Sequence, residues 1–318
     1  MSYRRAIFIL SFVLLFYPKL INAESEKDIY EQRLQLYKKT EAVTNIPWYF
    51  LAAVDQYERN TLTDTSDEPL ISITIPKHIW YGTGNVSYIE DERIISFFNG
   101  LGKDGNGDGK ATITNEEDIL YTFAHYLLSY GPSREDIKIA LFHFYKRDLT
   151  VKTIMNTARI FKKFHTTYLP ERTFPVSTDH NYSYRSTWGD RRGFGGLRMH
   201  EGTDIFANYG TPIFSTTYGV VELKGWNRFG GWRIGIRDIN NIYHYYAHLN
   251  SYADNIEVGD IVSPGDLLGF VGSSGYGPPG TMGKFPPHLH YGMYKDNGKS
   301  EWSFDPYPYL KRWESMTK

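Results

Sequence analysis

The chain has 318 residues, a length that favours two domains over one. Hydrophobic residues make up 41% and charged residues 22%, which supplies enough apolar surface for packed cores and excludes a wholly disordered chain. The formal net charge is -1, so the chain lacks the basic excess that is typical of nucleic-acid-binding proteins, and we expect no nucleic acid as a partner.

The N-terminus has the pattern of a secretory signal peptide. Arg4 and Arg5 precede an almost purely apolar segment at residues 6–17, and Ala23 supplies the small residue of a cleavage site. That segment is short against the roughly 20 residues that span a bilayer, so an uncleaved anchor is the weaker alternative. We predict a signal peptide at residues 1–23, a secreted protein, and no stable membrane insertion after cleavage.

Residues 24–170 carry the apolar spacing of α-helices. Apolar side chains recur three and four residues apart over 30–37, 119–127 and 154–161. The last of these stretches is expected to end near Phe164. This part of the chain is therefore predicted to be an all-α domain.

Two capping patterns predict where helices of this domain begin. Thr114 and Glu117 have the spacing of a capping box ahead of the second periodic stretch. Ser133 and Asp136 have the same spacing and open a further helix that should run to about Tyr145.

The segment at residues 46–53 (IPWYFLAA), followed by Glu58, resembles the helix of lytic transglycosylases that carries their catalytic acid. The resemblance implies a lysozyme-like fold and puts Glu58 in the place of that acid, which would need a raised pKa. Arg59 stands where that family has Ser, and no Gly-x-Met-Gln element follows. A domain that binds or positions glycan without cutting it, and a purely structural helix, are the alternatives.

An acidic, glycine-rich loop follows at residues 104–109. Asp104, Asn106 and Asp108 match the first oxygen ligands of an EF-hand loop, but its twelfth position is Asn115 instead of a bidentate Glu. The pattern predicts a calcium site at Asp104, Asn106 and Asp108. A turn between helices that binds no ion is the alternative.

Residues 171–318 read as short strands separated by glycine-rich turns. Apolar residues alternate over 232–236, a turn is expected at 238–241, and the run at 242–249 returns, which predicts a hairpin. Further apolar runs lie at 211–223, 267–272 and 288–294. The expected fold is multidomain α+β, with a helical domain at 24–170 and an all-β domain at 171–318.

Histidines cluster in this β domain. His288 and His290 form an H-x-H pair, and side chains two apart leave the same face of a strand about 7 Å apart. Between His200 and Asp204, Gly202 permits a bend that brings imidazole and carboxylate onto one ion. Two histidines and one carboxylate match the ligand count of a catalytic zinc site. Bound zinc activates water for amide hydrolysis, which suits a chain without cysteine.

His244 and His248 offer a competing metal pattern. Their spacing copies the two ligands of H-E-x-x-H zinc proteases, but Tyr245 stands in the place of the general-base Glu and the surrounding residues favour a strand. On a strand, His244 and His248 share a face, so His244 is a candidate for the same groove. The alternative for His244 is a packing or surface role. His248 is available as a proton carrier.

Three segments resemble the motifs of the lysostaphin/LytM-type zinc endopeptidases of bacterial cell walls. They are residues 199–205 (MHEGTDI), 246–249 (YAHL) and 287–291 (PHLHY), in that order. The resemblance implies an antiparallel β fold with a long open groove, zinc as cofactor, and peptidoglycan as the substrate and partner.

The same resemblance implies a role for each of five side chains. Zinc would be bound by His200, Asp204 and His290, while His248 and His288 would be the catalytic histidines. Which of the two catalytic histidines is the general base stays open.

Residues 275–288 and the N-terminal half are similar to the sporulation L-Ala–D-Glu endopeptidases of bacilli. This likeness implies cleavage within peptidoglycan stem peptides during cell-wall or spore-cortex remodelling. The alternatives are a D,D-endopeptidase that cuts wall cross-links, a peptidase that cuts glycine bridges, a non-catalytic wall-binding or activator protein, and a transglycosylase that uses the β domain for targeting.

Overall fold

The computed structural model describes residues 26–62, 69–193 and 196–317. The predicted signal peptide at 1–23 lies outside these residues. In the described ranges, every helix is too short or too polar to cross a membrane. The described residues divide into two compact units: 26–55, 69–141 and 165–168 form the first, and 56–62, 142–164, 169–193 and 196–317 form the second.

The first half of the chain is helical, as its apolar spacing predicts. Each of the three periodic stretches falls within a helix, and the last helix ends at Phe164 as expected. The helices are an N-terminal one over residues 26–44, α2 (Trp48–Thr61), α3 (Lys77–Trp80), α4 (Glu92–Phe97), α5 (Glu116–Leu128), α6 (Arg134–Tyr145) and α7 (Asp148–Phe164).

One of the two predicted caps is confirmed and the other is wrong by a residue. Ser133 Oγ accepts a hydrogen bond from the Asp136 N–H, and Asp136 Oδ2 accepts one from the Ser133 N–H, both at 3.1 Å. Helix α5 is capped by Asn115 instead of Thr114, because Asn115 Oδ1 accepts from the Glu117 N–H at 3.0 Å. Asn caps a helix at least as well as Thr, so the capping pattern does not distinguish Thr114 from Asn115 as the first residue of the helix cap.

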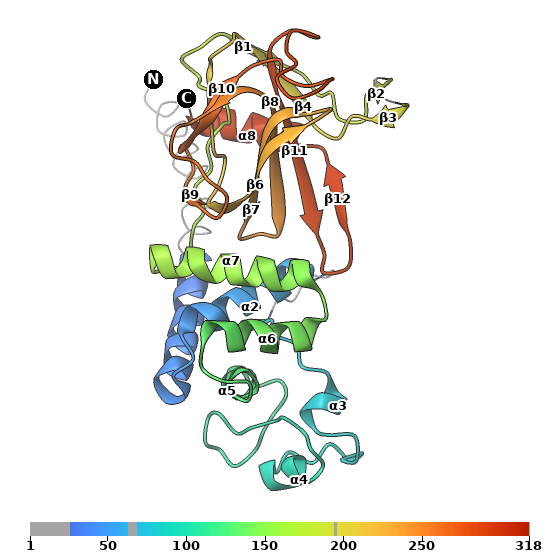
Figure 1. Cartoon of the computed structure of the whole chain (residues 1–318). Coiled ribbons are helices and arrows are strands. Elements are labelled where there is room, and N and C mark those ends of the chain that lie inside the picture. Colours follow the sequence, from blue (N-terminus) through green and yellow to red (C-terminus); the bar gives the residue numbers. More distant parts are fainter. Residues whose placement is uncertain (1–25, 63–68, 194–195, 318) are drawn as a thin grey trace, which may run out of the picture. The chain divides into compact units, whose positions relative to one another are not determined.

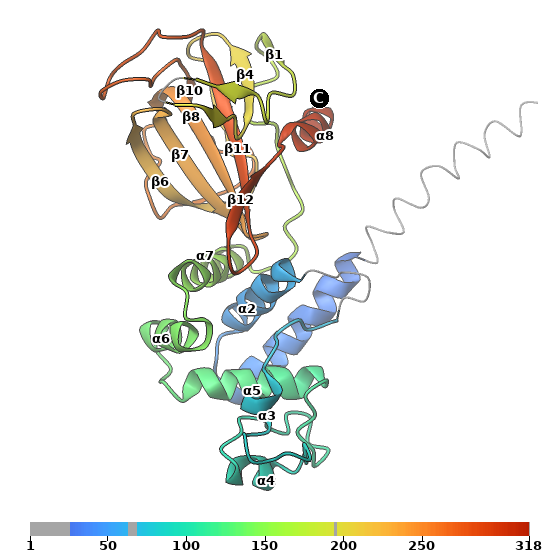
Figure 2. The same ribbon diagram turned by 90° about the vertical axis from the view of Figure 1, so that its right-hand side faces the viewer.

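The second unit is built on a ten-stranded antiparallel sheet (Figure 2). Its main path runs β1-β4-β11-β8-β7-β6-β9, with β10 beside β5 and β8, and β12 beside β11; β2 and β3 form a separate pair. The strands are β1 (Tyr182–Tyr184), β2 (Arg191–Arg192), β3 (Arg198–Met199), β4 (Thr203–Ala207), β5 (Pro212–Phe214), β6 (Gly219–Asn227), β7 (Gly231–Asp238), β8 (Ile242–Tyr252), β9 (Ile261–Val262), β10 (Leu267–Val271), β11 (His288–Asp296) and β12 (Glu301–Phe304).

The predicted hairpin is present as β7 and β8. Ile236 pairs with His244, and the turn between the strands is held by Asp238 Oδ1, which accepts from the Asn240 and Ile242 N–H groups at 2.8 and 2.9 Å. Asn241 takes a left-handed conformation there, with φ 59°, which asparagine tolerates better than most residues. The antiparallel arrangement expected for this domain is confirmed.

The expectation of an all-β domain is wrong in one element. Helix α8 (Tyr307–Thr317) buries Leu310 and Trp313 in the core beneath the sheet. Two prolines near its start and a run of charged residues masked its apolar spacing in the sequence. Helix α7 also belongs to this unit. Arg147, the residue before α7, makes a bidentate ion pair with the buried Asp296 at 2.7 and 2.9 Å.

Candidate metal centre and substrate groove

Two neighbouring strands bring a histidine and a carboxylate together. His290 on β11 lies directly opposite Asp204 on β4, and side chains paired in this way leave the same face of a sheet. His200 arrives from the turn that precedes β4. Gly202 lies in that turn, and a Cβ at this position would come within 2.6 Å of the His290 ring. The glycine is therefore needed for the close approach of the turn to His290.

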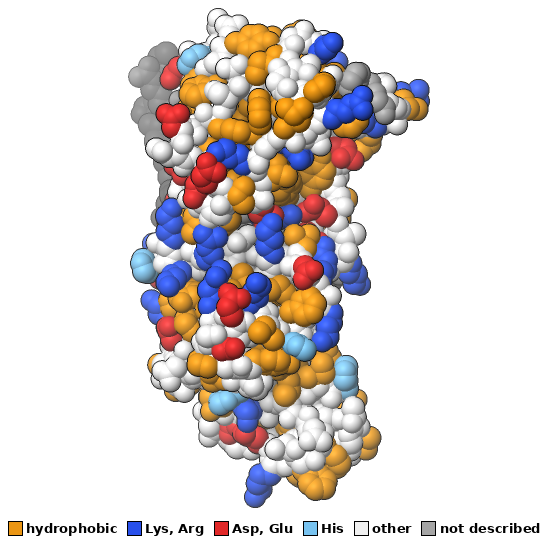
Figure 3. Space-filling view, viewed as in Figure 1, with side chains coloured by type: hydrophobic (Ala, Val, Ile, Leu, Met, Phe, Trp, Pro, Cys, Tyr) orange, Lys and Arg blue, Asp and Glu red, His pale blue; other side chains and the backbone are white. Residues whose placement is uncertain are grey.

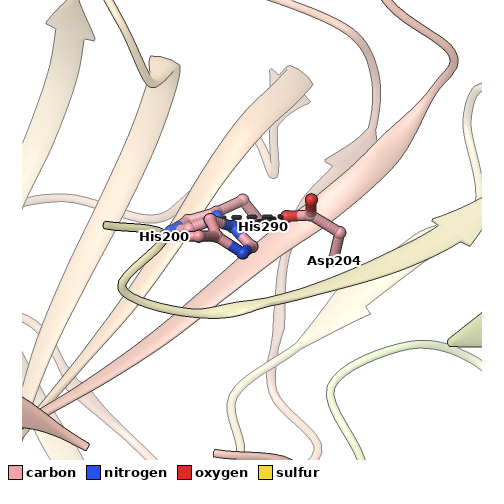
Figure 4. A group of neighbouring side chains, drawn as sticks. All are labelled: His200, Asp204 and His290. Atoms are coloured by element: carbon pink, nitrogen blue, oxygen red, sulfur yellow. Dashed lines mark hydrogen bonds and ion pairs between the residues drawn. The ribbon is translucent and has the colours of Figure 1, made fainter. Parts of the chain in front are cut away.

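Three ligand atoms converge in the space these residues enclose (Figure 4). His200 Nε2 lies 2.8 Å from His290 Nδ1 and 3.0 Å from Asp204 Oδ1, and His290 Nδ1 lies 3.2 Å from the same oxygen. His200 and Asp204 are buried and His290 is nearly so. Among the described residues, this is the group of His, Asp and Glu side chains that is arranged to hold a metal ion.

The protonation states suit metal binding. His200 Nδ1 lies 2.7 Å from the Thr187 carbonyl oxygen, which can only accept, so Nδ1 carries the proton and the lone pair of Nε2 faces the other two ligand atoms. Burial raises the pKa of Asp204, but its interactions with the His200 and His290 rings outweigh burial and hold that pKa well below its ordinary value. Asp204 is therefore a carboxylate, and the set offers two imidazoles and one anionic oxygen, the donor chemistry of zinc.

Two more histidines lie beside this group. The His288 ring is 4.8 Å from the His248 ring, and His288 Nε2 is 3.6 Å from Asp204 Oδ1. His248 Nδ1 donates to the Ser274 carbonyl at 2.7 Å, and His288 Nδ1 donates to the Pro286 carbonyl at 2.8 Å. Both rings therefore direct an unprotonated Nε2 into the groove. Burial lowers the pKa of each ring, which keeps both neutral.

His248 reaches the groove because strand β8 carries a bulge. Tyr246 pairs with Ile234 and Leu249 pairs with Trp232, so two residues of β8 stand opposite the single Arg233 of β7. His248 itself takes a left-handed conformation, with φ 64°. The extra residue changes the face of the sheet to which His248 points.

The bulge overturns the expectation that His244 shares a face with His248. His244 is 1% exposed and lies on the core side of the sheet, where its Nδ1 is 2.6 Å from the Tyr291 hydroxyl and its Nε2 is 3.2 Å from Asp238 Oδ2. Tyr243 and Tyr245, which alternate with it, line the groove instead. His244 is a packing residue, as the alternative held.

The groove over the metal ligands has a volume of about 720 Å³. Its walls are mainly aromatic, and its charged residues include three arginines. The aromatic walls are supplied by Phe206, Phe229, Tyr243, Tyr245, Tyr276, Phe285 and Tyr294. A surface of this kind can hold an extended peptide against the metal ligands.

Known proteins share this region and much of the remaining chain. The model of peptidase family M23 matches residues 198–303. The chain is 59% identical over 304 residues to the L-Ala–D-Glu endopeptidase of Bacillus subtilis (strain 168), an alignment that covers 94% of this chain and 93% of that protein. The chain belongs to peptidase family M23.

Other known proteins match a smaller share of the chain. The peptidoglycan DD-endopeptidase ShyC of Vibrio cholerae is 29% identical over 140 residues, which cover 44% of this chain and 26% of that protein. The solved catalytic domain of lysostaphin from Staphylococcus simulans is 31% identical and aligns with 42% of this chain and 93% of that domain, with a TM-score of 0.33. As an M23 member, the chain is a metallopeptidase.

Arg192 is a contact of the M23 site that the sequence did not suggest. Its guanidinium, on strand β2, donates to Asp204 Oδ2 at 2.6 Å, while the other oxygen of that carboxylate faces the two histidines. Arg192 also lies 3.0 Å from His200 Nδ1, but that nitrogen already carries a proton, so the contact is not a hydrogen bond. Arg192 fixes the Asp204 carboxylate in one orientation, and no local motif sets Arg192 apart from Arg191 beside it.

Glu58, the candidate acid of the helical half, lies on α2. It is half-buried, and its Oε1 accepts a hydrogen bond of 2.6 Å from the Tyr145 hydroxyl. The helix predicted around it is present, since α2 spans Trp48–Thr61.

The acidic loop of the helical half binds its own backbone. Asp104 accepts hydrogen bonds from the Gly107 and Gly109 N–H groups, each at 2.7 Å, and Asn106 Oδ1 accepts from Asp108 N–H at 2.9 Å. The twelfth position, Asn115, is used as the cap of α5.

Asp118, on helix α5, supports this loop, and no sequence pattern indicates this role. It is fully buried, and its two oxygens accept from the N–H groups of Gly105, Asn106 and Thr112 at 2.8, 3.2 and 2.7 Å. The capping interpretation drew attention to Glu117, whereas the buried neighbour has the structural role.

Proposed function

We propose that this M23 peptidase uses zinc to hydrolyse the L-Ala–D-Glu bond in the stem peptides of peptidoglycan. The observation that carries the proposal is the convergence of His200, Asp204 and His290 with His248 and His288 at the bottom of one groove. The choice of bond is supported by the 59% identity to an L-Ala–D-Glu endopeptidase along nearly the whole of both chains.

In this proposal His200 Nε2, Asp204 Oδ1 and His290 Nδ1 hold the zinc ion. When bound, zinc makes water nucleophilic near neutral pH and polarises the carbonyl of the scissile bond. Arg192 keeps Asp204 in its binding orientation, and the Thr187 carbonyl does the same for His200.

His248 and His288 move the protons. Each has its Nδ1–H engaged by a backbone carbonyl, so each can take a proton from the attacking water only at Nε2. The ring that takes the proton becomes an imidazolium, and its Nε2–H can then donate to the developing oxyanion or to the leaving amine. Which ring acts first is left open.

Product analysis tests the proposed bond. Purified peptidoglycan digested with the full mature chain should release fragments that begin with a D-Glu amino terminus, identified by mass spectrometry. New termini at a cross-link would indicate the D,D-endopeptidase alternative, and anhydro-sugar ends would indicate glycan cleavage with Glu58 as acid. Release of no fragment by the zinc-loaded protein would favour a wall-binding or activator role.

We further propose that the protein is secreted, acts at the cell wall, and serves sporulation. The wall is where a peptidoglycan substrate lies, and residues 1–23 have the pattern of a signal peptide. Amino-terminal sequencing of the protein recovered from outside the cell should begin at Glu24. A chain that stays inside the cell would contradict this part of the proposal.

We propose that residues 24–170 form a lysozyme-like domain that positions glycan, and that the peptidase domain begins at residue 171. Support comes from the likeness of residues 46–53 and Glu58 to the transglycosylase helix. Calcium binding at Asp104, Asn106 and Asp108 is a separate proposal that rests on their spacing alone. Calorimetric titration of the full chain with calcium should show a heat of binding, and the Asp104→Ala variant should show none. The absence of a heat of binding in the wild type would contradict the calcium proposal.

A further inference from the structure

The groove contains two arginines whose charge is not balanced. Arg192 is paired with Asp204, but Arg198 on β3 and Arg233 on β7 make no ion pair with any carboxylate that the structure describes. Figure 3 shows Lys and Arg side chains (blue) gathered where β2 and β3 lie. The other free charge of the groove is Glu201, which accepts a hydrogen bond of 3.3 Å from the Tyr294 hydroxyl.

Arg233 is held beside the metal ligands. Its guanidinium carbon lies 6.0 Å from the centre of the Tyr245 ring, and that ring lies 5.9 Å from the ring of His290. One tyrosine ring therefore separates the charge of Arg233 from a zinc ligand. The Nε atom of Arg233 is buried and has no hydrogen-bond partner in the described part of the chain.

Arg198 lines the same groove from strand β3. Its guanidinium carbon lies 5.5 Å from the centre of the Phe229 ring. Arg198, Arg233 and Tyr245 all line this groove, and the two arginine charges oppose the rise that burial causes in the pKa of Tyr245. A guanidinium over an aromatic ring keeps its N–H groups free at its edge, ready for a planar, anionic partner.

The proposed substrate supplies an anion at the matching point. Glutamate has two carboxyl groups, and only one of them continues the peptide, so the residue that follows the scissile bond carries a free carboxylate. An extended peptide advances about 3.3 to 3.6 Å per residue, so this carboxylate stays within one or two residues of the bond being cut. A glycine at the same position would offer no such group.

We infer that Arg233, together with Arg198, binds the free carboxylate of the D-Glu residue that follows the scissile bond. The inference rests on the proposed function, and it explains why the enzyme would cut the L-Ala–D-Glu bond in preference to other bonds. Both residues are specificity determinants, because they contact the substrate beside the reacting bond and not the reacting atoms themselves.

The test compares two peptides and four forms of the full-length, zinc-loaded protein. One peptide is a stem peptide with D-Glu, and the other is the same peptide with its free carboxylate amidated. The proteins are the wild type, Arg233→Gln, Arg198→Gln and the control Arg191→Gln, whose exposed side chain lies outside the groove. kcat/KM is measured for each pair, and zinc content is measured for each protein.

The wild type should prefer the D-Glu peptide by roughly 10- to 100-fold, the range expected for a charge-assisted hydrogen bond. Arg233→Gln should lose most of this preference by cutting the D-Glu peptide more slowly, while it cuts the amidated peptide at the wild-type rate and keeps its zinc. Arg198→Gln should lose a smaller part, and Arg191→Gln should lose none.

Other outcomes separate this inference from the proposed function. If the wild type cuts both peptides equally well between L-Ala and the next residue, the carboxylate site is wrong and the proposed function stands. If Arg233→Gln slows both peptides equally, Arg233 has a structural role only. If the wild type cuts neither peptide, the proposed bond is wrong and the inference is wrong with it. Should Arg233→Gln fail to fold, the wild-type preference and Arg198→Gln still decide.

Discussion

The groove of the sheet and the acidic loop of the helical half both bring together side chains that could bind a cation. In the groove, His200 Nε2, His290 Nδ1 and Asp204 Oδ1 face one another. In the loop, Asp104 and Asn106 direct their oxygens to the N–H groups of the loop itself. The difference lies in where the lone pairs point.

That difference comes from the supporting structure. Strands β4 and β11 fix Asp204 and His290 as a cross-strand pair, and backbone carbonyls outside the centre take the outer N–H of His200, His248 and His288. In the acidic loop, the side-chain oxygens of Asp104 and Asn106 accept from backbone N–H groups of the loop itself. In the groove, by contrast, other parts of the fold hold the outer atoms of these side chains and leave the lone pairs of the proposed ligands facing one another.

Removing a metal ligand should have the largest effect. His200→Ala and Asp204→Ala should lose bound zinc and lower kcat/KM by about 1000-fold or more, since the ion supplies several kcal/mol of transition-state stabilisation. Zinc content by mass spectrometry and peptide release from purified wall measure both effects. Asp118→Ala, on helix α5 beneath the acidic loop, should keep its zinc. Peptide release by His200→Ala at the wild-type rate would contradict the mechanism.

Removing a proton carrier should separate zinc binding from turnover. His248→Ala and His288→Ala should each keep a full complement of zinc but lower kcat by roughly 100- to 10,000-fold, the range for loss of general acid–base catalysis. Loss of zinc from either variant would show that the residue holds the metal and would reverse its assigned role.

Removing the support of Asp204 should weaken zinc binding by a smaller factor. Arg192→Gln takes away the donor at 2.6 Å from Asp204 Oδ2, and loss of such a partner costs about 10- to 100-fold in metal affinity. Competition with a coloured chelator measures that affinity. The adjacent, exposed Arg191→Gln is the matched control, and equal affinities for the two variants would remove the role given to Arg192.

Removing the support of the acidic loop should affect stability alone. Asp118→Ala leaves three N–H groups of Gly105, Asn106 and Thr112 without their acceptor, which should lower the free energy of unfolding by about 2 to 3 kcal/mol. Urea unfolding followed by circular dichroism measures the change. A Tm and urea midpoint equal to those of the wild type would show that water replaces the carboxylate at no cost.

The sequence predicts the parts of this site that depend on regular structure. The alternation of strand residues places His288 and His290 on one face, and the motif order links them to His200 and Asp204. The positions of His244 and His248 depend instead on a bulge opposite Arg233, and a single extra residue reverses the face of a strand. The alternation of residues in the sequence does not reveal where such a bulge occurs.

Contacts between segments that are distant in the sequence are likewise not predicted by any local pattern. Arg192 reaches Asp204 from a short hairpin, and α8 adds Leu310 and Trp313 to the core although its spacing is interrupted by prolines. The cap at Asn115 was misassigned to its neighbour because both residue types suit the position. In each case the local sequence fits more than one arrangement equally well, and contacts with distant parts of the fold determine which arrangement forms.

An anomalous difference map from crystals of the full mature chain, recorded at the zinc absorption edge, tests the central claim most directly. The account predicts one strong peak about 2.0 to 2.2 Å from His200 Nε2, Asp204 Oδ1 and His290 Nδ1, with His248 and His288 beyond bonding distance. A peak bound by a different set of residues, or an active crystal with no peak between these three, would contradict it.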